Sequence, residues 1–219
     1  MTQVKICGLT RAGDAAAAEA AGAVYGGVIL APGSPRTVTP GRVLEIFDGS
    51  GLERVGVFVN EARDRIADLA AGLGLAVVQL HGDESPEFAA AIGAATGAEV
   101  WKAIRPRDAA EFVSAATKFE GAVAGLLVDG WSAAARGGTG ARFPWREVAA
   151  HRAGLGTGTR LIAAGGLGPD NVAEVISILD PDVVDVSSGV ERSAGEKDEV
   201  LIRRFAAAAG AAAAQKRAG

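Results

Sequence analysis

The sequence predicts an α/β fold, a single (β/α)8 TIM barrel with a parallel eight-stranded core, and three observations lead to this prediction. Short runs rich in valine, isoleucine and leucine alternate eight times with alanine-rich amphipathic stretches. These runs are apolar almost throughout, as is typical of parallel strands covered on both faces. The chain of 219 residues is 49% apolar, which is sufficient for one large core.

The elements of this barrel can be assigned in order along the chain. Strands are expected at residues 3–7, 24–30, 54–58, 75–80, 99–104, 124–128, 160–164 and 182–186. Helices are expected at residues 11–21, 61–73, 86–95, 108–118 and 171–179, several of which begin at Asp, Ser or Pro. Eight strand–helix units favour a sheet that closes into a barrel, and an open doubly wound sheet is the alternative. The barrel is expected to occupy residues 1–205, followed at 206–219 by the end of the last helix and a disordered alanine-rich tail.

Composition and charge exclude several classes of protein. No apolar run approaches the roughly 20 residues that span a bilayer, and the start MTQVKIC lacks the basic region of a secretion signal. A net charge of −4 without a basic run argues against a nucleic-acid partner. The single cysteine excludes an internal disulfide, and no cysteine or histidine cluster has metal-binding spacing. We therefore expect a cytoplasmic monomer or homodimer that needs no membrane, nucleic acid, metal or cofactor.

The turns after the seventh and eighth strands predict a phosphate site. They have the sequences AAGGLGPDNV (163–172) and VDVSSGVE (184–191), and each joins an apolar run to a helix. Glycine and serine at such a junction let backbone N–H groups hold an anion where the helix dipole is positive. Either turn alone is equally well explained by a tight turn, but barrels of this type bind phosphate at these two positions. A small phosphorylated molecule is therefore the expected ligand. The candidate phosphate residues are Gly165, Gly166, Ser187, Ser188 and Gly189.

Reactive and charged side chains follow other predicted strands, at the same rim of the barrel. Cys7 ends the first strand, Arg36 lies in the turn after the second, His81 follows the fourth and Asp129 closes the sixth. Each has a simpler explanation as an apolar filler or a turn residue. A thiol and a carboxyl that face each other across a phosphate-anchored pocket, however, form a base and acid pair. An isomerisation or elimination fits this set better than redox chemistry or phosphoryl transfer.

A lysine below the cysteine bears on the reactivity of its thiol. Lys5 lies on the same face of the first strand as Cys7, one layer deeper, and Asp185 on the adjacent eighth strand is within its reach. The ammonium lowers the pKa of a nearby thiol, but an ion pair with Asp185 reduces that effect. The alternative is a purely structural ion pair in the barrel floor. Both interpretations stay open at this point.

Several motifs, taken in order, resemble one family. They are VKICGLT, PRTVTP, VGVFVN, VQLHGDE, LLVDG, RGGTG with FPW, AAGGLGPDNV, and VDVSSGVE followed by GEKD. Their order and spacing from the first strand to the eighth helix resemble the phosphoribosylanthranilate isomerase family of tryptophan biosynthesis. The resemblance implies an Amadori rearrangement of N-(5-phosphoribosyl)anthranilate to 1-(2-carboxyphenylamino)-1-deoxyribulose 5-phosphate.

The resemblance also implies roles for the candidate residues. Asp129 would be the general acid that opens the sugar ring, Cys7 the general base, and Arg36 the ligand of the anthranilate carboxylate. The phosphate-binding turns of the family match the two turns predicted above to bind phosphate, after the seventh and eighth strands. Gly138 and Gly140 of the GGTG segment would fold over the substrate.

Some positions are less clearly assigned. His81 matches the family motif as a substrate contact or a loop brace. Ala31 replaces the larger residue that is usual in the family, and Trp131 makes the sixth loop unusual, which bears on rate and substrate breadth. Two alternatives remain: the histidine-pathway sugar isomerase or a dual-substrate relative, and a non-catalytic barrel that senses phosphorylated metabolites.

Overall fold

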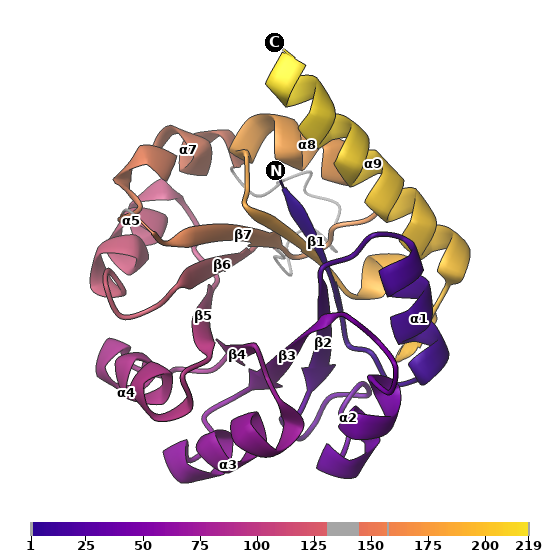
Figure 1. The fold of residues 1–219 in the computed structure, drawn as a ribbon. Helices are drawn as coiled ribbons and strands as arrows, with labels where there is room; N and C mark the ends of the chain where they lie inside the picture. The colour runs from indigo at the N-terminus through magenta and orange to yellow at the C-terminus, as the bar shows by residue number, and fades with distance from the viewer. Residues whose placement is uncertain (1, 131–144, 157, 219) are drawn as a thin grey trace.

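The strands form a closed barrel in the order of the chain. A computed structural model describes residues 2–130, 145–156 and 158–218. The parallel strands pair sequentially from β1 to β8, and β8 pairs with β1 (Figure 1). The predicted barrel is therefore confirmed, and the open sheet is excluded. The strands are β1 (Gln3–Cys7), β2 (Tyr25–Ile29), β3 (Glu53–Phe58), β4 (Val77–Leu80), β5 (Glu99–Ile104), β6 (Gly125–Asp129), β7 (Arg160–Ala164) and β8 (Val183–Val186).

Helices surround the barrel on its outer side, as Figure 1 shows. They are α1 (Ala12–Ala20), α2 (Pro40–Ile46), α3 (Arg63–Leu73), α4 (Pro86–Thr96), α5 (Ala109–Lys118), α7 (Trp145–Ala150), α8 (Val172–Leu179) and α9 (Glu199–Ala218), with 3-10 turns at η1 (Arg152–Gly154) and η2 (Ser188–Val190). The last helix, α9, packs between α8 and α1 and so covers the seam where the barrel closes. It continues as helix to Ala218. The boundary at residue 205 and the disordered tail stay predictions.

Large side chains fill the interior of the barrel. Trp101 is fully buried there and meets Tyr25 edge to face, with ring centroids 5.0 Å apart. Gly125 on the neighbouring strand β6 makes room for it, since a Cβ at that position would lie 2.7 Å from the indole. Aliphatic residues from the other strands complete this inner cluster: Val55, Val77, Leu127, Ile162 and Val183. A second, larger apolar cluster joins the outer face of the strands to the helices.

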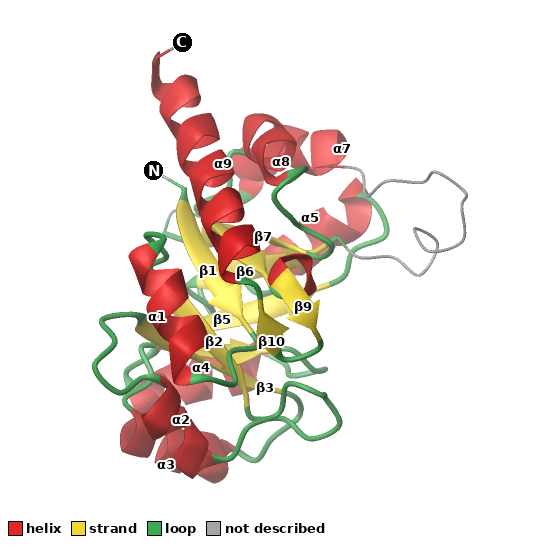
Figure 2. Cartoon of the chain, turned by 90° about the vertical axis from the view of Figure 1, so that its right-hand side faces the viewer, coloured by secondary structure: helices red, strands yellow, loops and turns green. Residues whose placement is uncertain are grey.

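A short hairpin follows the last barrel strand. The 3-10 turn η2 leads into β9 (Glu191–Ser193), which pairs antiparallel with β10 (Glu196–Lys197), as seen in Figure 2. This hairpin brings two charged residues of the motifs VDVSSGVE and GEKD next to each other. Among the helices that the structure describes, none is long and apolar enough to cross a membrane.

Candidate active site

A cavity of about 650 Å³ opens at the carboxyl ends of the strands. Eight sequence-predicted residues line it together: Cys7, Arg36, His81, Asp129, Gly165, Gly166, Ser187 and Ser188. The remaining lining residues are Ile29, Ala31, Pro32, Gly33, Ser34, Val57, Val59, Gln79, Arg105, Ala164, Leu167 and Asp185. Gly138, Gly140 and Trp131 lie outside the described residues. The strands thus deliver a thiol, a carboxyl, an arginine and two glycine–serine turns to one space.

Cys7 ends β1 and is buried, with only 7% of the residue exposed. It faces Gly27 on β2, where a Cβ would lie 3.0 Å from Sγ. Burial raises the pKa of the Cys7 thiol, and Lys5 only partly offsets this because Asp185 acts in the opposite direction. The net direction is therefore upward, opposite to the lowering of the thiol pKa that a nearby ammonium alone would cause.

Lys5 and Asp185 form the buried pair that the sequence suggested. They are register partners on β1 and β8, and Lys5 Nζ lies 2.9 Å from Asp185 Oδ1, although the geometry is not that of a hydrogen bond. The two side chains are 0% and 8% exposed. Burial lowers the pKa of Lys5, but the carboxylate of Asp185, the largest of the opposing causes, acts against this and the net pKa is raised. A charged ammonium therefore lies beneath the thiol.

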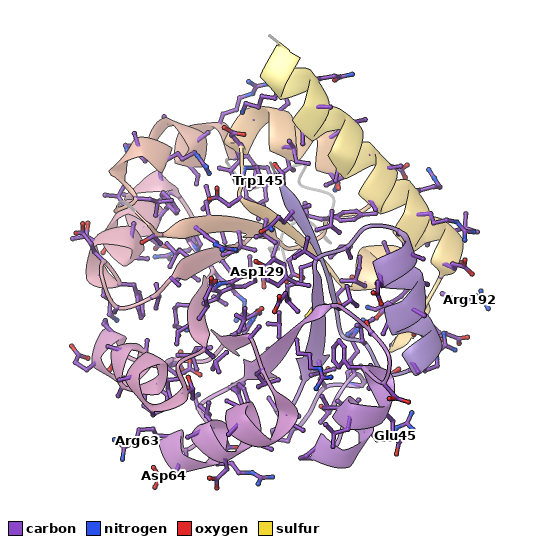
Figure 3. The ribbon with its side chains drawn as sticks, viewed as in Figure 1. Glu45, Arg63, Asp64, Asp129, Trp145 and Arg192 are labelled. Carbon is purple, nitrogen blue, oxygen red and sulfur yellow. The ribbon has the colours of Figure 1, made fainter. Side chains whose placement is uncertain are left out.

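Asp129 ends β6 and lies within the ring of strands when the barrel is viewed along its axis (Figure 3). Its Oδ2 accepts a hydrogen bond of 3.2 Å from Arg105 Nε and lies 3.7 Å from His81 Nε2. The buried amide of Gln79 holds the other side of the imidazole, with Nε2 3.0 Å from His81 Nδ1.

Arg36 lines the cavity from the loop after β2, and an acidic residue holds it there. Its Nε and Nη2 donate to the two carboxylate oxygens of Glu191, at 2.8 and 2.6 Å. The backbone of Gly8 passes beneath the arginine at φ +74°, and a Cβ on Gly8 would lie 2.6 Å from Arg36 Cδ. Only glycine tolerates both the backbone conformation and this close approach.

The two glycine–serine turns meet beside the cavity. Gly165 and Gly166 have φ of 87° and 65°, as expected for a turn that requires glycine. Asn171 braces this turn, since its Oδ1 accepts from the Gly168 N–H at 2.8 Å and its Nδ2 donates to the Gly166 carbonyl at 2.9 Å. Gly189, which the sequence also predicts to bind phosphate, belongs to η2 and is not one of the residues that line the cavity. A Cβ on Gly189 would collide with the Leu167 carbonyl, so its place in the structure is to let the two turns pack together.

Four residues of the site were not predicted from the sequence. Glu191, Lys197, Gln79 and Arg105 each contact a candidate residue. Glu191 ends the motif VDVSSGVE, which predicts a phosphate turn, and Lys197 belongs to GEKD, which enters only through the family resemblance. The available signal was the charged residue Glu191 directly after the predicted phosphate turn; the sequence GEKD does not single out Lys197 among its three charged residues.

Fold and cavity together define a class: a (β/α)8-barrel enzyme with a thiol, a carboxyl and phosphate-type turns at the carboxyl ends of its strands. The family described as N-(5'phosphoribosyl)anthranilate (PRA) isomerase matches residues 4–208 of the chain. The chain belongs to this family of isomerases, whose reaction is a step of tryptophan biosynthesis.

Named relatives agree along nearly the whole chain. The N-(5'-phosphoribosyl)anthranilate isomerase of Pelobacter propionicus is 42% identical over 207 residues, which cover 94% of each chain. The phosphoribosyl anthranilate isomerase of Thermotoga maritima has a TM-score of 0.85 at 34% identity. The match covers 96% of this chain and 100% of that chain. Another such isomerase, in complex with reduced 1-(o-carboxyphenylamino)-1-deoxyribulose 5-phosphate, has a TM-score of 0.83 at 32% identity, with 96% of this chain and 100% of that chain covered.

Proposed function

We propose that this chain catalyses the Amadori rearrangement of N-(5-phosphoribosyl)anthranilate to 1-(2-carboxyphenylamino)-1-deoxyribulose 5-phosphate, with Asp129 as general acid and Cys7 as general base. The observation that carries the proposal is that both residues line one cavity with Arg36 and the turns after β7 and β8. The reduced product bound in the homologous isomerase has a carboxylate and a phosphate, the same two anionic groups as the proposed substrate.

The first step needs a proton donor at the ring oxygen of the sugar. Asp129 gives its proton to that oxygen while the lone pair on the anthranilate nitrogen forms a C=N bond, and the ring C–O bond breaks. The product of this step is an open-chain protonated imine. His81 Nε2 lies 3.7 Å from Asp129 Oδ2, beside the carboxylate that remains.

The second step needs a base at the carbon next to the imine. Cys7 first releases its thiol proton to solvent, and the thiolate accepts the proton of that carbon while the C–H electron pair moves toward the nitrogen to give an enolamine. The enolamine then tautomerises to the ketone. Although burial raises the pKa of Cys7 in the unliganded protein, the cationic imine formed in the first step favours the thiolate when the base is required. The ammonium of Lys5 acts in the same direction.

The two ends of the substrate are fixed by separate parts of the cavity. Backbone N–H groups around Gly165 and Gly166, with the hydroxyls of Ser187 and Ser188, suit the phosphate. Arg36 suits the anthranilate carboxylate because its planar fork matches a carboxylate. Gly138 and Gly140, which lie outside the described residues, are proposed to contact the substrate, and Gly189 to belong to the phosphate-binding turn.

The test follows the loss of phosphoribosylanthranilate fluorescence with purified wild type, Asp129→Asn and Cys7→Ser. We expect each substitution to lower kcat by about 10²–10⁴ while the reduced product analogue binds about as well as to wild type. Glu45→Gln, on the exposed outer side of α2, is the control. Wild-type kcat in Asp129→Asn would refute the acid assignment. Turnover of the histidine-pathway ribosyl amine in place of this substrate would favour the alternative enzyme.

A further inference from the structure

The arginine proposed to bind the carboxylate of the substrate is itself held by a buried acid. Glu191 accepts two hydrogen bonds from Arg36, and its side chain is only 4% exposed. The two residues are 155 positions apart in the chain. Since Arg36 comes from the loop after β2 and Glu191 from the hairpin after β8, the contact joins two sides of the cavity rim.

A second cation completes this cluster. Lys197 Nζ donates to Glu191 Oε1 at 2.8 Å and to the backbone carbonyl of Ser187 at 3.1 Å, and its side chain is fully buried. Ser187 lines the cavity in the proposed phosphate turn. Lys197 therefore connects the acid that holds Arg36 to the turn that faces the other end of the substrate.

The charges of the cluster suit an incoming carboxylate. Arg36 and Lys197 contribute two positive charges and Glu191 one negative charge, so the cluster keeps one net positive charge. Glu191 alone would neutralise Arg36 and remove its attraction for an anion. The hydrogen bonds to Glu191 involve Nε and Nη2, and no described residue accepts from Nη1. A guanidinium has five N–H donors, so Nη1 and the second Nη2 hydrogen form a further fork for the ligand.

We propose that Glu191 is a positioning residue for carboxylate recognition: it fixes the guanidinium plane of Arg36, and Lys197 supplies the positive charge that Glu191 would otherwise cancel. This inference rests on the proposed function, because it requires Arg36 to bind the substrate carboxylate. A purely structural clamp between the two loops is the competing explanation. The explanations differ in one respect: only positioning makes the effect of Glu191 depend on the carboxylate of the ligand.

The experiment measures, by calorimetry, the binding of two stable ligands to the full chain. One is the reduced product analogue, and the other is the same compound without the carboxylate on its aromatic ring. In Glu191→Gln we expect affinity for the first ligand to fall about three- to tenfold, the range for a side chain that must be ordered upon binding. Affinity for the second ligand should change less than about twofold.

Further variants separate orientation from charge and from folding. Glu191→Asp keeps the charge but withdraws the carboxylate, and we expect the same selective loss. Lys197→Met should weaken the first ligand more than the second. Arg36→Met should lose selectivity for the carboxylate, and adding Glu191→Gln to it should cause no further selective loss.

The outcomes distinguish this inference from the proposed function. If Arg36→Met weakens only the carboxylated ligand while Glu191→Gln and Glu191→Asp weaken both ligands equally or neither, the positioning role is overturned and the proposed function stands. Tighter binding of the carboxylated ligand to Glu191→Gln also overturns it. If Arg36→Met does not discriminate between the ligands, the carboxylate assignment of Arg36 fails, and the inference fails with it.

Discussion

Replacement of Glu191 by glutamine should change how the stability of the protein depends on pH. Burial of Glu191 favours its neutral form, but hydrogen bonds and charge from Arg36 and Lys197 outweigh this and lower its pKa from 4.5 to about 2. Because the folded-state pKa is depressed, the ionised carboxylate stabilises the fold above about pH 4.5, and this stabilisation is lost as the pH falls toward 2.

The magnitude follows from these two values. At about 1.36 kcal/mol per pH unit, a pKa lowered from 4.5 to about 2 corresponds to about 3.4 kcal/mol at pH 7. Since the Arg36 end of the pair is 20% exposed, solvent screening reduces this to about 2–3 kcal/mol. At pH 3, where the unfolded carboxyl is mostly protonated, linkage leaves about 1 kcal/mol.

Urea unfolding of wild type and Glu191→Gln at pH 7, 5 and 3 measures this difference. We expect the variant to be less stable by about 2–3 kcal/mol at pH 7 and by about 1 kcal/mol at pH 3, because wild type approaches the uncharged variant as it protonates. Glu45→Gln, whose exposed carboxylate pairs with Arg42, should stay within about 0.5 kcal/mol of wild type. A deficit that is independent of pH, or that grows in acid, would refute the reasoning.

Three further substitutions test separate parts of the structure. Gly8→Ala should raise KM more than Gly33→Ala, because both glycines have positive φ but only Gly8 would place a methyl against the carboxylate-binding arginine; equal KM values would contradict this. Lys5→Met should lower the free energy of unfolding by about 3–5 kcal/mol by leaving Asp185 unpaired. Adding Asp185→Asn should recover part of that loss in urea unfolding, and no recovery would argue against the ion pair. Ser85→Ala removes the side-chain cap of α4 and should cost about 1 kcal/mol with kcat unchanged; a loss of kcat would show that this cap reaches the site.

The barrel was predictable because its strands carry a local signal. Strand β7 is apolar on both faces after Arg160, and the bounds of β1 and β7 agree with those expected from sequence. Helix α2 (Pro40–Ile46) was not anticipated, since it is short and begins with a Pro-Gly pair that resembles a turn. The seven residues of α2 are too few for a helical pattern of apolar residues to distinguish them from the preceding loop.

The candidate site was predictable as a set of residues but not as a network. Cys7 and Asp129 lie at strand ends, and the fold alone brings them to one cavity. The contact of Arg36 with Glu191 depends on the closure of the barrel over 155 positions, which no spacing rule contains. The direction of the Cys7 pKa depends likewise on burial and on two charges from different strands.

The most direct test of the account is a crystal structure of this protein with the reduced product analogue. We expect the phosphate to contact the turns at Gly165–Gly166 and Ser187–Ser188, with Cys7 Sγ and the carboxyl of Asp129 on either side of the sugar carbons. A phosphate bound at another part of the rim, or a sugar that reaches only one of these two groups, would contradict the account.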